Sequence, residues 1–288
     1  MFQKLRKSKK LLLVAMACAT FAIAGCGSDT TKNAADNGNA VTWSETFDGT
    51  KTDFAVKSSP THAVSMSQAT TEMMLQLGLE DKMAGTAFKE EEIYPPLQAA
   101  YDKVKVLSDK WPSYEVFMSV KPDFATGWPD SFSKRAIPAD KMIAQKVNIW
   151  LPESMLSTKA DLETNFNDMI KLGEIFGVKS KAEEWVAGQR KTLAAIQDKL
   201  KDLPRKRVFI YDSEDGQPFT AFEGYTTNIL KLIGADNVMS GLGVDKTWAK
   251  GSWETVIAQN PDYIIIADYG TSIRNDDDFQ QKIEKIKS

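Results

Sequence analysis

The sequence predicts an α/β fold with two lobes joined by one long helix, and three observations support this. Short apolar runs alternate with amphipathic stretches, which is typical of βαβ units around a mainly parallel sheet. A second set of apolar runs follows an amphipathic stretch at 181–203, and a pattern near Ser113 recurs near Ser252. The length of 288 residues, with 42% hydrophobic and 26% charged residues, suits one large domain or two lobes.

The N-terminus predicts an export signal at residues 1–25. Five basic residues between Lys4 and Lys10 precede an uncharged run from Leu11 to Ala24. That run is shorter than the ~20 residues that a membrane span needs. Removal of residues 1–25 lowers the net charge from −3 to −8, because five positive charges and no negative ones leave. Residues 26–40 are small and polar, so we expect a flexible tether there.

We expect an N-terminal α/β lobe at residues 41–160. Its first strand candidate is Ala63–Met66, and a helix at Ala69–Leu77 follows, with Gly78 suited to its C-terminal end. Further strand candidates alternate with helical or loop segments, as expected for a parallel sheet. They lie at 82–85, 104–107, 123–126 and 147–150.

A helical connection is expected at residues 161–204. From Lys181 to Leu203, apolar residues recur at three- and four-residue steps, and Pro204 ends the pattern. A helix of this length would measure ~35 Å and could bridge two lobes rigidly. An ordinary packing helix within one domain is the alternative. The stripe consists of Ala182, Val186, Leu193, Ile196, Leu200 and Leu203.

A C-terminal α/β lobe is expected at residues 205–288. Its apolar runs at 207–211 and 263–267 are of the kind that is buried on both faces. The segments 113–124 and 252–263 share Ser, Glu, Pro and Asp at one constant offset of 139 residues. Each copy predicts an N-capped helix, a Pro-Asp turn and a strand, so the offset favours two similar lobes. A chance match of a common helix–turn–strand pattern is the alternative.

Composition excludes several functions. A net charge of −3 gives no basic footprint for nucleic acid. One His and two Cys cannot build a His-rich or Cys-rich metal site, so we expect no metal site of the protein's own and no cofactor. The sequence has no nucleophile elbow, P-loop or dinucleotide fingerprint, and we expect His62 to be structural and the protein not to be an enzyme.

Several segments together resemble one protein family. Ala63–Leu79 is similar to the opening strand and helix of ferric-siderophore and cobalamin binding proteins, the substrate-binding components of ATP-binding-cassette importers. Val120–Phe124 resembles the family's Lys-Pro-Asp turn. The resemblance, over roughly residues 55–275, implies two Rossmann-like α/β lobes joined by one long rigid helix, the bilobal periplasmic-binding-protein-like fold. The C-terminal segments that carry it are Leu232–Val238, Trp253-Glu254 and Asn260–Asp262.

A second resemblance concerns the end of the export signal. Ile23-Ala24-Gly25-Cys26 is similar to the bacterial lipobox, in which the Cys is acylated and becomes the new N-terminus. This implies an extracytoplasmic lipoprotein anchored to the cell membrane through Cys26. A plain signal peptide with a chance Cys is the alternative.

The family resemblance implies a small-molecule metal chelate held in a cleft between the lobes. Open α/β sheets bind ligands beyond the carboxyl ends of their strands, and the loops there are rich in aromatic residues. For each of them, core packing is the alternative. The candidates are Phe88, Trp111, Trp128 and Trp150 in the N-terminal lobe and Tyr211, Phe219, Trp248 and Tyr269 in the C-terminal lobe.

Family members dock on their permease through one acidic residue on each lobe. The resemblance places Glu72 at the N-terminal position, whereas Asn228 stands where an acidic residue is usual, and Glu223 is a nearby substitute. The resemblance implies that the permease and its ATPase are the partners, and that the binding protein itself is a monomer. Family members also continue some forty residues further, so the sequence is either a fragment or has a trimmed C-terminal lobe.

The choice of ligand is less sharply indicated. Anionic ferric siderophores call for clustered cations, but the candidate loops carry only Lys110, Arg135, Lys246 and Lys250, well separated. This favours a neutral or weakly charged chelate, with a ferric siderophore, a corrinoid and a haem-like molecule all open. A surface adhesin, a binding lipoprotein for another ligand and a chelatase-like enzyme are the alternative functions.

Overall fold

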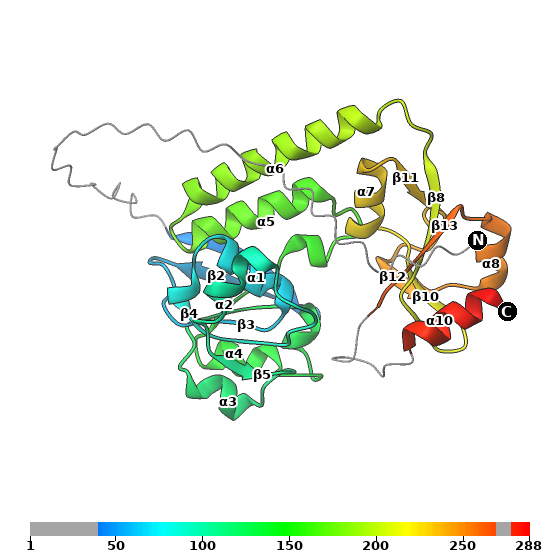
Figure 1. Cartoon of the computed structure of the whole chain (residues 1–288). Helices are drawn as coiled ribbons and strands as arrows, with labels where there is room; N and C mark the ends of the chain where they lie inside the picture. Colours follow the sequence, from blue (N-terminus) through cyan, green and yellow to red (C-terminus); the bar gives the residue numbers. More distant parts are fainter. Residues whose placement is uncertain (1–39, 269–277) are drawn as a thin grey trace, which may run out of the picture. The chain divides into compact units, whose positions relative to one another are not determined.

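The computed structural model describes residues 40–268 and 278–288 (Figure 1). Two parallel sheets organise these residues, and the helices α5 and α6 lie between them in the sequence. We call the part built around strands β3–β7 the N-lobe and the part built around strands β8–β13 the C-lobe. The predicted α/β fold with two lobes is confirmed.

The N-lobe sheet has the order β5-β4-β3-β6-β7, and all its neighbouring strands are parallel. Since the chain runs from β3 outward to β5 and then from β6 outward to β7, the order reverses between β3 and β6. Ligands bind in open α/β folds at such a switch point. The strands are β3 (Ala63–Ser65), β4 (Met83–Ala87), β5 (Val106–Ser108), β6 (Phe124–Thr126) and β7 (Asn148–Trp150), each within two residues of its predicted segment at either end.

The first helix starts beside this switch point. Helix α1 (Gln68–Gln76) is capped by the Ser67 hydroxyl, which accepts a hydrogen bond from the Thr70 amide. It ends at Leu77, and Gly78 follows with a φ of +64°, as predicted. The remaining N-lobe helices are α2 (Gln98–Tyr101), α3 (Tyr114–Ser119) and α4 (Ala139–Ala144), with 3₁₀ turns η1 (Glu80–Lys82), η2 (Pro95–Leu97), η3 (Pro129–Phe132) and η4 (Glu153–Met155).

An antiparallel hairpin that we did not predict begins the N-lobe. Strands β1 (Val41–Phe47) and β2 (Thr50–Val56) are joined by Asp48-Gly49, both with positive φ, as a two-residue type I′ turn requires. The hairpin is attached to β7, because the Trp43 indole donates a 2.7 Å hydrogen bond to the Ile149 carbonyl.

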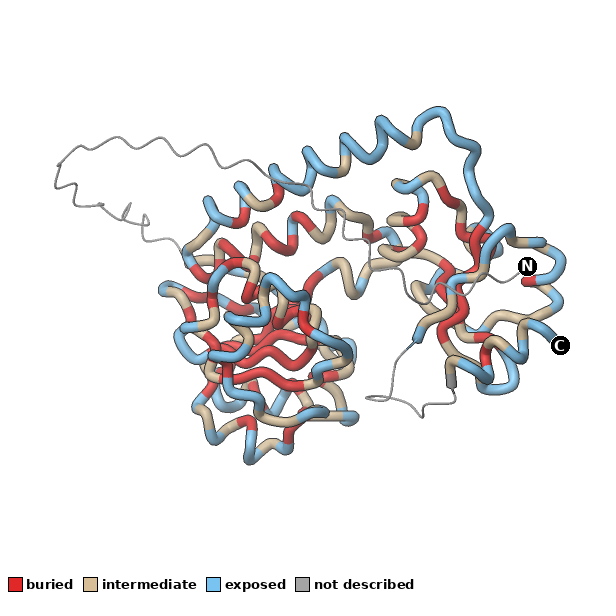
Figure 2. The backbone as a smooth tube through the Cα atoms, in the orientation of Figure 1, coloured by how far each residue is buried: buried red, intermediate tan, exposed pale blue. Residues whose placement is uncertain are grey.

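The long connecting helix is shorter than predicted and only partly packed. Helix α6 (Lys179–Leu200) runs beside α5 (Leu162–Ile175), and a Cβ on Gly173 would lie 2.7 Å from the Ala182 Cβ (Figure 1). The Arg190 guanidinium pairs with Glu163 in the first turn of α5. The residues of α6 after Arg190 therefore extend beyond the N-terminal end of α5. The second half of the apolar stripe is therefore not buried, and Ile196 is 41% exposed (Figure 2).

The C-lobe has a parallel sheet of order β11-β8-β13 and a small antiparallel sheet of order β12-β10-β9. We expected Tyr263–Ala267 to be buried on both faces, and this was wrong. Ile264 and Ile266 pack against the core, but Tyr263 and Ile265 point to the other face and are 57% and 47% exposed. The elements are β8 (Lys206–Tyr211), β9 (Ser213–Glu214), β10 (Pro218–Ala221), α7 (Tyr225–Leu232), β11 (Ala235–Asn237), β12 (Trp248–Lys250), α8 (Trp253–Gln259), β13 (Tyr263–Ile266) and α10 (Asp278–Lys287).

The repeated segments have the same structure in both lobes. Ser113 caps α3 and Ser252 caps α8, each by accepting a hydrogen bond from the amide three residues later. In the Pro-Asp turns, the Asp123 carboxylate accepts from the His62 amide, and the Asp262 carboxylate accepts from the Arg207 amide. Each turn thus ties the start of its strand to the neighbouring parallel strand, and the repeat is structural.

In residues 40–268 and 278–288, no helix combines the length and apolarity that crossing a membrane requires. The predicted export signal, the tether up to residue 39 and Cys26 lie outside the described residues.

Candidate functional site

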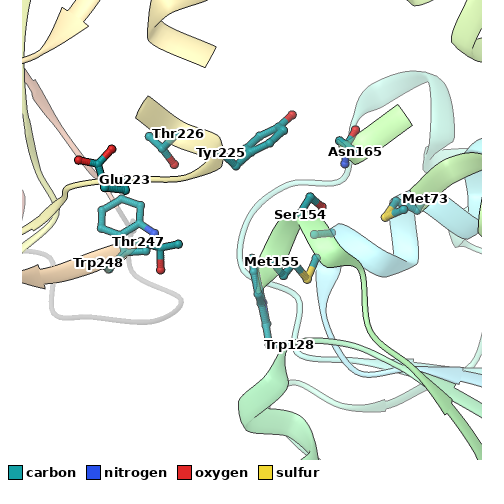
Figure 3. A pocket seen from close by; sticks show the side chains of 11 residues that line it. Met73, Trp128, Ser154, Met155, Asn165, Glu223, Tyr225, Thr226, Thr247 and Trp248 are labelled. Carbon is teal, nitrogen blue, oxygen red and sulfur yellow. The ribbon is translucent and has the colours of Figure 1, made fainter. Parts of the chain in front are cut away.

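A pocket of about 490 Å³ is lined by side chains of both lobes (Figure 3). Its N-lobe side is next to the switch point of the sheet, because α1 follows β3 and Trp128 follows β6. Its C-lobe side is formed around the start of α7 and of β12. The lining residues are Ala69, Met73, Trp128, Ser154, Met155 and Asn165 on one side and Glu223, Tyr225, Thr226, Thr247 and Trp248 on the other.

Trp128 is held in position by the loop after β4. Its indole Nε1 donates a 3.2 Å hydrogen bond to Glu90 Oε2. Burial raises the pKa of the Glu90 carboxyl, and the bond from Trp128 opposes that rise. The loop itself is attached to α1, because the Gln68 side chain accepts from the Glu90 and Glu91 amides. Trp128, one aromatic wall of the pocket, is therefore connected to α1 through Glu90 and Gln68.

A buried carboxylate positions the pocket residues Ser154 and Met155. Asp168 of α5 is 5% exposed, and its two oxygens accept 2.9 Å hydrogen bonds from the Glu153 and Ser154 amides at the start of η4. Burial raises the pKa of Asp168, while these hydrogen bonds act in the opposite direction. Asp168 thus acts on the pocket through the backbone of η4.

A second buried carboxylate supports the preceding residues. Glu45 of β1 is 7% exposed, and Oε1 accepts a 3.0 Å hydrogen bond from the Leu151 amide. Burial raises the pKa of Glu45 to about 7; the bond from Leu151 lowers it and the nearby Asp168 adds to the rise. Hydrogen bonds to these two carboxylates therefore fix the backbone of residues 151–154, which leads into the pocket lining.

The C-lobe wall is built by pairing between residues 221–223 and 246–248. The Phe222 amide donates to the Thr247 carbonyl, and the adjacent Ala221 is in register with Trp248. Phe219 stacks on Trp248 with ring centroids 6.2 Å apart. Trp248 therefore lines the pocket while Phe219 stacks against its ring.

Glu223 and Tyr225 flank a glycine at the start of α7. Gly224 has a φ of +85°, and a Cβ there would lie 2.8 Å from Thr247 Cγ2 and 3.1 Å from the Ser157 carbonyl oxygen. Only glycine fits this position without strain. Burial, with a smaller contribution from Asp168, raises the pKa of the Tyr225 phenol.

The pocket can enclose a flat or rounded molecule with polar edges. Two tryptophans and a tyrosine supply large apolar surfaces, and the hydroxyl and amide groups between them supply hydrogen bonds. In the part of the chain that the structure describes, no group of three or more His, Cys, Asp or Glu side chains could hold a bare metal ion.

Comparisons with known proteins agree with this architecture. The sequence profile of a family described as "Periplasmic binding protein" matches residues 64–287. The chain belongs to the periplasmic binding protein family.

Individual family members are similar over most of the chain. A crystal structure of a periplasmic binding protein from Veillonella parvula is 96% identical, with a TM-score of 0.83, over 87% of this chain and 84% of that one. An uncharacterized ABC transporter substrate-binding lipoprotein of Bacillus subtilis, YvrC, is 26% identical over 91% of this chain and 82% of its own length. A vitamin B12-binding protein of Yersinia pestis is 23% identical over 74% of this chain and 71% of its own length.

The described aromatic residues among those predicted for this periplasmic binding protein fall into three groups. Trp128 and Trp248 line the pocket. Trp150 and Tyr211 are instead in the hydrophobic cores, 4% and 1% exposed, because their strand register turns them toward the packed face. Phe88, Trp111 and Phe219 are half-buried outside the lining: Phe88 stacks on Trp111 at 4.6 Å, and Phe219 stacks on Trp248. Tyr269 lies outside the described residues.

The acidic residues that the family resemblance singled out have different surroundings. Glu72 is half-buried on α1, and Oε1 accepts hydrogen bonds from Gln68 Nε2 and the Tyr94 amide. Glu223 lines the pocket. Asn228 donates a 2.7 Å hydrogen bond to the Ala160 carbonyl, so this side chain links α7 to the loop that leads into α5.

None of the four scattered cations lines the pocket. Arg135 is paired with Asp130, and Lys250 is paired with Asp215 at 2.7 Å. Lys110 and Lys246 are exposed; Lys246 precedes the lining residue Thr247, and its carbonyl accepts from the Glu223 amide.

The hydroxyl and amide residues of the lining and the two buried carboxylates were not predicted from the sequence. A usable signal existed for both carboxylates. Glu45 follows Val41 and Trp43 on the inward-facing, alternate positions of β1. Asp168 lies among the buried residues Phe166 and Met169 of α5. An acidic residue on the apolar face of an element is rare unless its carboxylate is hydrogen-bonded.

Proposed function

We propose that this protein is the substrate-binding lipoprotein of an ATP-binding-cassette importer, and that it delivers a metal chelate to the import permease. The pocket of about 490 Å³ between two Trp-bearing walls is the observation that carries this proposal. Relatives support it: YvrC is named as an ABC transporter substrate-binding lipoprotein, and another relative as a vitamin B12-binding protein. The proposed chelates are a ferric siderophore, a corrinoid or a haem-like molecule.

Chelate binding is tested by thermal unfolding in the presence of a panel of ferric siderophores, corrinoids and haem. A ligand that binds only the folded protein stabilises it by ~2.7 kcal/mol at a concentration of 100 Kd. A clear rise in Tm with at least one chelate, and none with free iron or cobalt, is the expected result. No shift with any member of the panel would refute the proposed function.

Transport needs no chemical transformation of the ligand in this proposal. The loaded protein presents Glu72 to an arginine of the permease, and the ATPase drives release and import. We assign docking on the N-lobe to Glu72; Glu223, the C-lobe candidate, lines the pocket.

The docking role has a direct test in whole cells. Glu72→Gln removes the charge but keeps an oxygen that can accept from the Tyr94 amide, whereas Glu72→Ala removes both. Both variants should bind ligand as the wild type does and should lose most uptake. The exposed Glu184→Ala on α6 is the matched control. Normal uptake by both Glu72 variants would contradict the docking role.

Anchoring through Cys26 completes the proposal. Because residues 1–25 have the organisation of an export signal that ends before a Cys, acylation at Cys26 would keep the protein at the outer face of the cell membrane. Cys26→Ala should move the protein from the membrane fraction to the soluble extracytoplasmic fraction. Unchanged membrane association of this variant would argue against the lipid anchor.

A further inference from the structure

The lining of the pocket is unbalanced in charge. In the part of the chain that the structure describes, the lining includes one carboxylate, Glu223, and no Lys, Arg or His. The remaining polar groups are hydroxyls and one amide, which are neutral: Ser154, Asn165, Tyr225, Thr226 and Thr247. None of these lining side chains could neutralise an anionic ligand.

The charge of Glu223 is not neutralised by its hydrogen-bond partners. Its oxygens accept from the Ser240 hydroxyl at 3.0 Å and the Gly241 amide at 2.8 Å, and both donors are neutral. No Lys or Arg nitrogen of the described residues lies within 4.0 Å of this carboxylate. The backbone at Glu223 is paired with the segment that leads to Trp248, because the Glu223 amide donates to the Lys246 carbonyl, and both side chains line the pocket.

The aromatic walls favour positive charge as well. A tryptophan face attracts cations through its quadrupole, more strongly than tyrosine or phenylalanine. At Trp128 the indole N–H is held by a hydrogen bond to Glu90, which fixes the ring in the pocket wall. Trp128 and Trp248 both line the pocket (Figure 3).

We infer that the pocket selects chelates of zero or positive net charge over anionic ones, and that Glu223 sets this preference. The inference rests on the proposed function and narrows its substrate class. Amide-rich corrinoids and ferric trihydroxamates fit the neutral hydroxyl and amide groups. Chelates with free carboxylates, such as haem with its propionates, are disfavoured.

The test uses probes that share one metal core and differ only in charge. Ferrioxamine B is a monocation, its N-acetyl derivative is neutral and its N-succinyl derivative is a monoanion. Cyanocobalamin and its monocarboxylic acid supply a second core, neutral and anionic. Isothermal titration calorimetry of the purified protein at low ionic strength should show affinity falling about tenfold for each unit of negative charge, which equals about 1.4 kcal/mol per step.

Glu223→Gln tests the assigned residue, since it keeps an oxygen to accept from the Gly241 amide. The ratio of affinities between cation and anion should shrink from about a hundredfold to about tenfold or less. Glu254→Gln removes the same charge from an exposed site on α8, outside the lining, and should leave the ratio unchanged. Thermal melts of both variants check their folding.

The outcomes separate this inference from the proposed function. Equal affinities across the wild-type series, or tighter binding of the anion, would overturn the inference while leaving chelate binding intact. An unchanged ratio in Glu223→Gln would overturn the role of Glu223. Failure of every member of both series, together with the wider chelate panel, would overturn the proposed function and the inference with it.

Discussion

The buried carboxyl of Glu45 predicts an unusual dependence of stability on pH. Its pKa is raised from a usual value of 4.5 to about 7, with burial as the largest cause. A carboxyl whose pKa is higher in the folded state binds its proton more tightly there, so it favours folding at low pH. This contribution is complete below pH 4.5 and is lost as the pH rises through about 7.

The size of the effect follows from the two pKa values. The change from 4.5 to about 7 corresponds to about 3 kcal/mol between the acidic and alkaline limits. Glu45→Gln resembles the protonated form and keeps an oxygen to accept from the Leu151 amide. The variant should therefore match the wild type at pH 4 and exceed its free energy of unfolding by up to about 3 kcal/mol at pH 8.

Urea denaturation at several values between pH 4 and pH 8 measures this difference directly. Subtracting wild type from variant removes the titration of the groups that both proteins share. The exposed Glu184→Gln on α6 controls for the general loss of one negative charge. A difference between Glu45→Gln and the wild type that is the same at pH 4 and pH 8 would refute the reasoning.

Three further predictions concern packing, capping and the link between α7 and the loop that leads into α5. Gly173→Ala should lower the free energy of unfolding by about 1–3 kcal/mol in urea titrations, because the new Cβ would lie 2.7 Å from the Ala182 Cβ; an unchanged midpoint would show that α5 and α6 separate freely. Ser252→Ala should cost about 1 kcal/mol through loss of the α8 N-cap, while Ser252→Asp should retain most of it, and equal stability of both variants would contradict the capping role. Asn228→Ala should cost about 1 kcal/mol by removing the bond to the Ala160 carbonyl, and hydrogen exchange should rise locally at the start of α7; unaltered exchange there would argue against the link.

Local chemistry explains which parts of the fold could be predicted. The ends of α1 at Gln68 and Gln76 depend on the neighbouring Ser67 cap and Gly78, and both ends lie within one residue of the predicted Ala69–Leu77. The hairpin at 41–56 has an equally local signal in Asp48-Gly49, although the hairpin was not among the predicted elements. The exposure of Ile265, in contrast, depends on which elements cover β13, and no nearby residue reports that.

The site was harder to predict because orientation depends on tertiary structure. Trp150 ends a strand and Trp128 follows one, so both qualified as strand-end aromatics. A strand residue faces one side or the other according to its register, and Trp150 faces the core. Strand register does not determine the orientation of Trp128, because this residue lies in the loop after β6. Its indole is oriented by the hydrogen bond to Glu90.

The internal repeat shows why the scaffold was easier to predict than the pocket. The Pro-Asp turns perform one structural task in both lobes, since Asp123 accepts from the amide just before β3 and Asp262 accepts from the amide of the second residue of β8. The same offset of 139 residues takes Trp128 to Ala267, which cannot form an aromatic wall. The C-lobe supplies its tryptophan from β12 instead, in a different sheet. The offset therefore identifies residues that hold each sheet together, and those are not the residues that distinguish one ligand from another.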